Sequence, residues 1–171
     1  GILGRTCDRP CEPACRRTRT HEKPVAICRL KRVAADFKDD VSNLLPKALK
    51  KSNGKKIALI GGGPASLTVA RDLLVMGYEC TLFEKDPQAG GLMRTNIPSF
   101  RLPEKVLNEE VNQILDMGLI TKFNSEIKSL KEFLTKDFDA VFIGTGAPKG
   151  KDLNIPGRKE AEKNIHIGID F

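Results

Sequence analysis

The residues with the clearest chemical potential form a glycine turn between an apolar segment and a helical one. Residues 57–60 predict a buried strand, and Gly61-Gly62-Gly63-Pro64-Ala65-Ser66 follows it at once. In such a turn Gly61 allows the tight bend, and Gly63 lets a pyrophosphate approach the backbone. The free N–H groups at the start of the helix then face the phosphates. Ser66 replaces the third glycine of the motif, a position that tolerates a small residue. The turn predicts that Gly61, Gly63, Pro64 and Ala65 bind the ADP portion of a dinucleotide.

An acidic residue follows at the end of the next predicted strand. Glu84 lies 23 residues after Gly61. In dinucleotide-binding units, a carboxylate at this spacing accepts hydrogen bonds from the adenosine ribose hydroxyls. It would also repel a 2′-phosphate, which argues against NADP at this site. The alternative is a plain βα turn followed by a solvated strand end.

Two further pairs of glycines extend the predicted site, and the first of them favours FAD over NAD. Gly90-Gly91-Leu92 offers a second close backbone approach soon after the ribose site, a pattern common in flavoproteins that bind two dinucleotides. Gly144-Thr145-Gly146 follows another apolar strand, where a ligand crevice is expected. We therefore add Gly91, Leu92, Gly144 and Gly146 to the predicted cofactor site. The alternative for each pair is a simple turn.

The second chemical constellation is a set of cysteines near the start of the chain. Cys7, Cys11 and Cys15 follow a C-x3-C-x3-C spacing, and Cys28 comes 13 residues later on a predicted helix. Four thiolates can hold a [4Fe–4S] cluster, whereas zinc sites more often begin with C-x2-C or C-x4-C pairs. The alternatives are free thiols in a loop and, for Cys28, a buried helix thiol. Cys80 lies within a predicted strand and is expected to be a core residue.

Charge is concentrated in the cysteine-rich part. Residues 1–51 hold 13 Lys/Arg and 6 Asp/Glu, whereas residues 52–171 hold 16 of each. A basic arm suits an anionic cluster, and it also suits an acidic partner. A single Tyr and no Trp leave few stacking platforms for single-stranded nucleic acid, so no nucleic-acid partner is expected.

No apolar run is long enough to span a bilayer and no signal peptide is recognisable, so we expect no membrane span and a cytoplasmic location.

The elements that position these residues follow a βαβ order. A loop-rich stretch at 1–23 precedes predicted helices at 24–37 and 41–49, the second weakened by Pro46. Strands are expected near 57–60, 79–84, 119–123 and 140–143. Helices are expected at 64–76, 103–117 and 130–134, with a long loop at 86–102. This order predicts an α/β fold: a Rossmann-like parallel sheet at 52–171, as an FAD-binding half-domain, preceded by a small helical iron–sulfur segment at 1–51.

Residues 4–171 resemble part of the small subunit of NADPH-dependent glutamate synthase and its relatives, including the N-terminal half of dihydropyrimidine dehydrogenase. The residues that carry the resemblance are Gly4-Arg5-Thr6-Cys7, Cys11-Glu12-Pro13-Ala14-Cys15, Pro24-Val25-Ala26-Ile27, Gly61 to Ser66, Phe83-Glu84-Lys85, Gly90-Gly91-Leu92, Ile97-Pro98, Phe100-Arg101-Leu102-Pro103 and Phe142-Ile143-Gly144-Thr145-Gly146.

The resemblance implies an electron-transfer module of an NAD(P)H-dependent oxidoreductase. In this family NAD(P)H reduces FAD, and electrons pass through iron–sulfur clusters to other redox subunits or domains. The resemblance also implies that Arg101 reaches the pyrophosphate, and that neighbouring cysteines can serve two different clusters. The NAD(P)H-binding domain of the relatives has no counterpart here, so NAD(P)H is expected to bind a part of the protein outside this chain. Two alternatives are a shortened, non-catalytic nucleotide-binding scaffold subunit and a zinc-binding, nucleic-acid-associated protein.

Overall fold

Four short segments form a parallel sheet whose strand order is β3-β2-β1-β4. The computed structural model describes residues 1–20, 23–134 and 137–169. The strands are β1 (Lys56–Ile60), β2 (Glu79–Phe83), β3 (Ile120–Lys122) and β4 (Ala140–Ile143). The central strand β1 pairs with β2 on one side and with β4 on the other. The predicted parallel α/β sheet is therefore confirmed.

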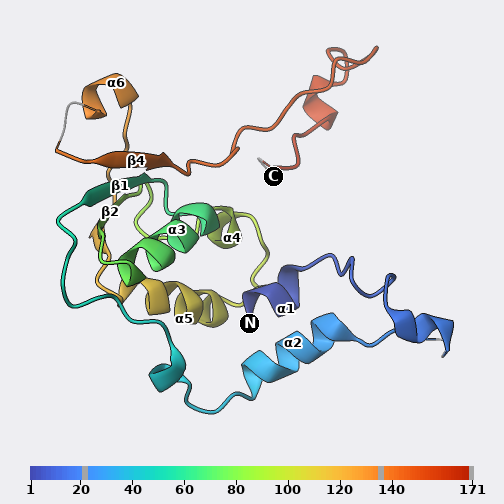
Figure 1. The fold of residues 1–171 in the computed structure, drawn as a ribbon. Helices are drawn as coiled ribbons and strands as arrows, with labels where there is room; N and C mark the ends of the chain where they lie inside the picture. The colour runs from blue at the N-terminus through green and yellow to red at the C-terminus, as the bar shows by residue number, and fades with distance from the viewer. Residues whose placement is uncertain (21–22, 135–136, 170–171) are drawn as a thin grey trace.

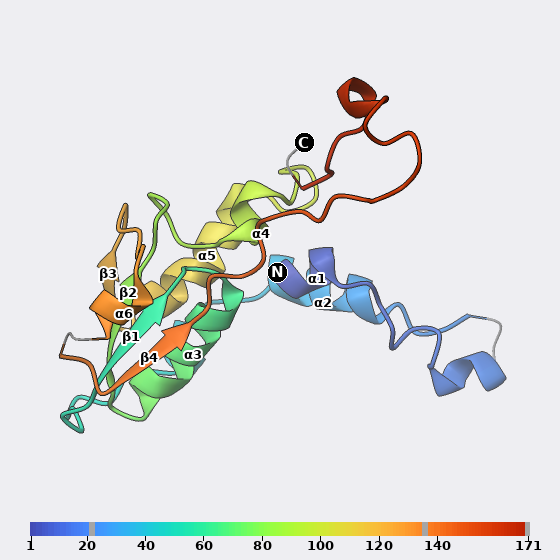
Figure 2. The same ribbon diagram turned by 90° about the horizontal axis from the view of Figure 1, so that it is seen from above.

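Alternation along β1 divides the core between the two faces of the sheet. Ile57 and Leu59 belong to the larger apolar cluster, together with residues of α3 (Pro64–Val75) and α5 (Glu104–Leu115). Ala58 and Ile60 belong to a smaller cluster with α6 (Leu130–Phe133). Successive side chains of a strand point to opposite faces, so one apolar strand supplies both layers. Figures 1 and 2 show α3 and α5 together on one side of the sheet and α6 on the other.

The N-terminal part is more helical near its start than its sequence suggests. Residues 1–23 were expected to be a loop, yet α1 (Ile2–Thr6) and a 3₁₀ turn, η1 (Arg16–Arg19), form there. The next helix, α2 (Ile27–Asp36), lies within the predicted range. The helix predicted at 41–49 was wrong, because only the short 3₁₀ turn η2 (Ser42–Leu44) forms before Pro46.

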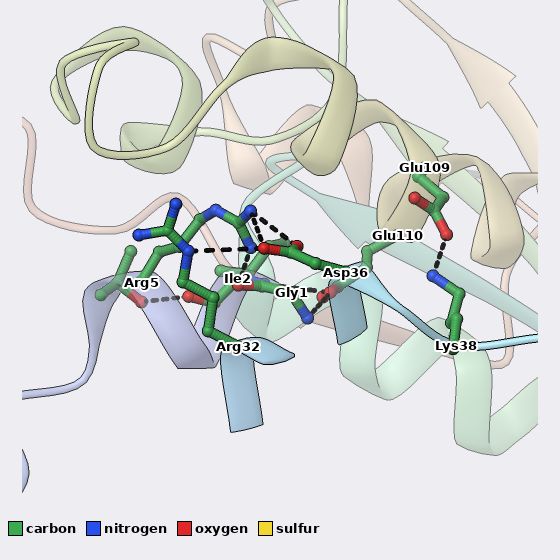
Figure 3. Close-up of polar contacts among 9 residues, drawn as sticks. Gly1, Ile2, Arg5, Arg32, Asp36, Lys38, Glu109 and Glu110 are labelled. Atoms are coloured by element: carbon green, nitrogen blue, oxygen red, sulfur yellow. Dashed lines mark hydrogen bonds and ion pairs between the residues drawn. The ribbon is translucent and has the colours of Figure 1, made fainter. Parts of the chain in front are cut away.

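Polar contacts join the N-terminal helices to one another and to α5 (Figure 3). The Arg5 guanidinium donates to both oxygens of Asp36, at 2.7 and 2.9 Å, which ties α1 to α2. The backbone N–H of Ile2 donates to Glu110 of α5, at 3.0 Å. Lys38, just after α2, pairs with Glu109. The cysteine-rich segment is thereby anchored on one helix of the Rossmann-like unit.

The last described residues extend away from the sheet (Figures 1 and 2). They include a single 3₁₀ turn, η3 (Glu162–Asn164). Their end returns to the body, where Asn96, just after the short helix α4 (Leu92–Thr95), donates its side-chain amide to Ile169 O at 3.0 Å. No helix of the described residues combines the length and apolarity needed to cross a membrane.

Candidate dinucleotide-binding cleft

The glycine turn begins where β1 ends, against the carboxyl end of β4. Gly61 has φ +93°, a conformation that favours glycine, and a Cβ there would lie 2.6 Å from the carbonyl oxygen of Gly144. Its N–H donates to Phe83 O of β2 at 2.8 Å. Both the backbone conformation and the neighbouring β4 therefore require a glycine at this position.

Gly63 differs from Gly61, because a side chain at position 63 would point into open space and not into protein. A Cβ on Gly63 would have only one neighbour within 4 Å, Gly144 O at 4.0 Å. Its φ of −76° suits any residue. Pro64 then starts the twelve-residue helix α3 at a position where its missing N–H costs no hydrogen bond. The space beside Gly63 thus lies at a helix N-terminus, where backbone N–H groups favour an anion such as a pyrophosphate.

Glu84 lies beside this turn and is only 5% exposed. One carboxylate oxygen accepts the N–H of Gly62, and the other accepts the N–H of Asp86 at 2.9 Å. A Cβ on Gly62 would lie 2.8 Å from the carboxylate. Two backbone donors therefore fix the orientation of Glu84, and each of its oxygens keeps a lone pair for another donor.

The second glycine pair packs directly on the first. The N–H of Gly90 donates to Gly62 O at 2.8 Å, and a Cβ on Gly91, whose φ is +53°, would lie 2.9 Å from the Cα of Gly63. Arg94 supports this loop from α4, because its Nε donates to Ala89 O at 2.9 Å. The loop is thus held against the glycine turn by close backbone contact.

These elements enclose a cleft of about 920 Å³. It opens at the carboxyl ends of the parallel strands, between β1 and its two neighbours, where α/β sheets bind ligands. Nine of the ten predicted cofactor residues line it: Gly61, Gly63, Pro64, Ala65, Glu84, Gly91, Leu92, Gly144 and Gly146. Sequence reasoning missed Ser125, Asn96 and Ile169, which also line the cleft. Ser125 follows β3 closely, so the strand order would have found it, whereas Ile169 comes from a segment without a motif.

The tenth residue, Arg101, is not among the residues that line the cleft. Its Nε donates instead to the carbonyl oxygen of Arg5 in α1, at 3.2 Å. In this orientation Arg101 contacts the N-terminal segment and not the glycine turn. A pyrophosphate contact by Arg101 stays a prediction that requires a different side-chain orientation.

The cysteines do not assemble into a ligand set. Within residues 1–20, 23–134 and 137–169, no group of three or more Cys, His, Asp or Glu side chains is placed to hold a metal ion. Cys11 is exposed, whereas Cys28 is only 3% exposed and its thiol donates to Gly4 O at 3.4 Å. The predicted ligation by Cys7, Cys11, Cys15 and Cys28 therefore does not match this conformation.

Two of the predicted ligand sulfurs nevertheless accept backbone N–H groups. Cys7 Sγ accepts from Arg9 at 3.4 Å. Hydrogen bonds from the backbone N–H groups of Val25 and Arg17 lower the pKa of the Cys15 thiol. Burial raises the pKa of Cys80 to about 11, in keeping with the core position predicted for it.

The fold and the cleft define a Rossmann-like dinucleotide-binding unit, and two comparisons agree. The NAD(P)-binding Rossmann-like domain family matches residues 59–123. Mycobacterium tuberculosis FprA in complex with NADPH superposes with a TM-score of 0.55 at 23% identity, over 61% of this chain and 25% of that one. At this identity, the likeness to FprA concerns the fold alone.

Curated relatives match nearly the entire chain. The NADP(+)-dependent formate dehydrogenase subunit beta of Moorella thermoacetica is 35% identical over 100% of this chain and 27% of its own length. The NAD-dependent dihydropyrimidine dehydrogenase subunit PreT of Salmonella typhimurium is 37% identical over 99% of this chain and 42% of its own length. The Glutamate synthase [NADPH] small chain of Bacillus subtilis is 34% identical over 99% of this chain and 34% of its own length.

The chain is therefore homologous, along nearly its whole length, to one portion of these NAD(P)-dependent oxidoreductase subunits, and the resemblance found in the sequence is confirmed. It spans between about a quarter and two-fifths of the length of these relatives.

Proposed function

We propose that this chain is the FAD-binding portion of an NAD(P)H-dependent electron-transfer subunit. The observation that carries the proposal is the open space beside Gly63. The neighbouring glycines Gly61 and Gly91 are closed in by backbone atoms, whereas Gly63 faces a gap at the start of α3. A pyrophosphate fits such a gap, because it needs both close backbone approach and free N–H donors.

FAD is favoured over NADP by the charge of Glu84. Its buried carboxylate lies where an adenosine ribose would bind, and it would repel a 2′-phosphate. The names of several relatives specify NADP or NADPH. A subunit of that kind therefore needs a second site for its nicotinamide cofactor, and the cleft described here takes the flavin.

The residues of this chain bind and orient the cofactor. In the proposed complex, Gly63 and the start of α3 hold the pyrophosphate, and Glu84 accepts the ribose hydroxyls. The loop at Gly90-Gly91 covers the turn from the other side. Bound FAD supplies hydride acceptance and single-electron release. The partners of the chain are then NAD(P)H and other redox subunits.

We also propose that Cys7, Cys11, Cys15 and Cys28 bind iron–sulfur in the native assembly. Cys7, Cys11 and Cys15 lie in a stretch with little buried side-chain surface, and the lowered pKa of Cys15 favours its thiolate. Since the present arrangement forms no ligand set, cluster binding requires the loop to rearrange and the Cys28 thiol to leave Gly4 O. Iron and acid-labile sulfide in the anaerobically purified assembly, lost in Cys11→Ser, would support this assignment. Zinc in their place would overturn it.

Titration of the flavin-free native protein tests the cofactor assignment. FAD, NAD⁺ and NADP⁺ are each titrated, and the expected order of affinity is FAD first and NADP⁺ last. Gly63→Val should abolish FAD binding, and Leu153→Asp, a change at an exposed residue that does not line the cleft, should leave it intact. Tighter binding of NADP⁺ than of FAD at this cleft would contradict the proposal.

A further inference from the structure

The chain leaves the dinucleotide cleft after β4 and returns to it near residue 169. Gly146 and Pro148 line the cleft on the way out, and Ile169 lines it on the way back. Between these points the chain runs away from the sheet and then turns back toward α4 (Figures 1 and 2). We call residues 147–169 the strap. Both ends of the strap therefore belong to the wall of the same cleft.

The returning end of the strap is fastened to the α4 side of the cleft. Asn96, just after α4, donates its side-chain amide to Ile169 O at 3.0 Å. Its side-chain oxygen accepts the hydroxyl of Thr95 at 2.5 Å. Both polar groups of the Asn96 side chain thus have protein partners, although the residue lines the cleft. We call the contact between Asn96 and Ile169 the latch, since it joins the strap to the opposite wall.

A second contact closes the strap on itself. A Cβ on Gly150 would lie 2.1 Å from Ile167 Cγ2 and 2.9 Å from Ile169 Cγ2. Such distances leave no room for a side chain at position 150, so the outgoing and returning limbs touch there. We call this contact the neck. An added methyl group at Gly150 would push the returning limb away and would loosen the latch as well.

The strap buries little of its surface, in contrast to the sheet and its helices. Residues 147–169 are all described by the structure, and none of them is buried. Helix α3 alone buries four residues: Ser66, Leu67, Ala70 and Leu74. A segment with few buried contacts opens at a low cost in free energy, while the packed elements stay folded. The strap can therefore open without unfolding the sheet.

The strand order places the strap at one end of the proposed cofactor. Glu84 follows β2, Gly63 follows β1, and the strap follows β4 on the other side of β1. A dinucleotide with its ribose at Glu84 and its pyrophosphate at Gly63 crosses β1 in the direction of β4. Its second half, which carries the flavin in FAD, therefore lies on the side of the strap.

We propose that the strap closes over the flavin end of the cleft and controls the exchange of the cofactor, with Asn96 as a positioning residue that holds it shut. This inference deepens the proposed function and rests on it. The latch and the neck open before FAD enters or leaves, and they close again afterwards. Lids of this kind commonly limit the rate at which ligands bind and leave. Asn96 acts on Ile169 and not on the cofactor, because its polar groups are already engaged.

Stopped-flow kinetics with the flavin-free, full-length protein tests the proposal. Mixing with FAD gives the association rate constant, and release into an excess of another flavin-free FAD-binding protein gives the dissociation rate constant. Asn96→Ala breaks the latch and Gly150→Ala opens the neck. Each should raise both rate constants about three- to tenfold, the effect expected from losing one hydrogen bond. The Kd should stay the same, because the strap is held shut in the free and the bound protein alike.

Two outcomes of these kinetics would overturn the proposal. Unchanged association rates in both variants would show that the strap does not limit entry. Faster dissociation of Asn96→Ala with an unchanged association rate would assign Asn96 a direct contact with the cofactor. Gly168→Ala is the matched control, since a Cβ there would meet no atom within 4 Å. This third variant should bind and release FAD at the parental rates.

Limited trypsin digestion of the flavin-free protein tests the strap without any cofactor. Lys149 lies beside Gly150 at the neck. Cleavage after Lys149 should be faster in Asn96→Ala and Gly150→Ala than in the parent, and unaltered in Gly168→Ala. Equal cleavage in all four proteins would refute the closed strap. A parent protein that binds no FAD would instead refute the proposed function, so the two failures are distinguishable.

Discussion

The hydroxyl of Ser66 occupies the space that a side chain on Gly144 would need. A Cβ on Gly144 would lie 2.1 Å from Ser66 Oγ. Ser66 is fully buried, and within the described residues its hydroxyl has no hydrogen-bond partner. The third position of the glycine turn and the carboxyl end of β4, where Gly144 lines the cleft, are therefore complementary in size.

The first prediction follows from this complementarity. Gly144→Ala should destabilise the fold by about 1–3 kcal/mol through overpacking. Ser66→Ala alone should be neutral or slightly stabilising, because it removes an unpartnered buried hydroxyl. The double variant should recover only part of the loss, since the Cβ at position 66 would lie 3.4 Å from the new methyl group, whereas Phe142 Cε1 would still lie 3.0 Å from it. Urea unfolding of the four proteins measures the coupling, and strictly additive losses would show that the two residues do not share this space.

The second prediction separates folding from binding within one turn. Gly61→Ala should destabilise the protein by about 1–3 kcal/mol, because it combines a positive φ with a contact to Gly144 O. Gly63→Ala should leave the stability of the flavin-free protein almost unchanged, since its Cβ meets open space, yet it should weaken FAD binding. Thermal unfolding with and without FAD tests both. A Gly63→Ala protein with unaltered FAD affinity would contradict the role assigned to that space.

The third prediction concerns the charge of Glu84. Glu84→Ala should weaken FAD binding by about 1–3 kcal/mol, the cost of losing charge-assisted hydrogen bonds to the ribose. Removal of the carboxylate should also narrow the preference for FAD over NADP⁺. Calorimetric titration of each ligand into parent and variant gives both quantities. Equal FAD affinities in the parent and in Glu84→Ala would show that Glu84 only accepts the backbone N–H groups of Gly62 and Asp86 and does not bind the ribose.

The fourth prediction uses the ion pair between α1 and α2. Hydrogen bonds from Arg5, and then from Arg32, lower the pKa of Asp36. A carboxyl group whose pKa is lowered on folding stabilises the fold above its unfolded pKa of about 3.9 and loses that contribution as pH falls through the lower folded value. The protection factors of the backbone amides of residues 2–6, which correct the exchange rates for their intrinsic pH dependence, should therefore fall below about pH 4. In Asp36→Asn these protection factors should already be lower at neutral pH, without the additional acid step.

Much of the Rossmann-like unit was predictable because its signals are local. Short apolar runs and turn glycines placed all four strands within two residues of their observed ends. Nine of the ten predicted cofactor residues line the cleft, since the carboxyl ends of parallel strands must meet at one edge. The position of the long Arg101 side chain was less predictable, because it depends on where α1 docks.

The N-terminal segment resisted prediction for a related reason. The five-residue helix α1 is too short to be stable from its own sequence, and it is held by Glu110 and Asp36 from distant parts of the chain. The spacing of the cysteines could not show that the Cys28 thiol faces Gly4 O. Such contacts between remote segments leave no periodic signal in the sequence.

The sheet order also sets a sequence of events during synthesis. Ile57 pairs with Cys80, only 23 residues later, but it pairs on its other side with Ala140, 83 residues later. At about 5–20 residues per second, the ribosome delivers β4 roughly 3–12 s after β2. The turn at Gly61–Gly63 is therefore synthesised before β4 can pair with β1, and Gly144 is the last of these residues to reach the site. A nucleotide bound before that moment would meet an unfinished site, so we expect a dinucleotide to bind this cleft only after β4 has been synthesised.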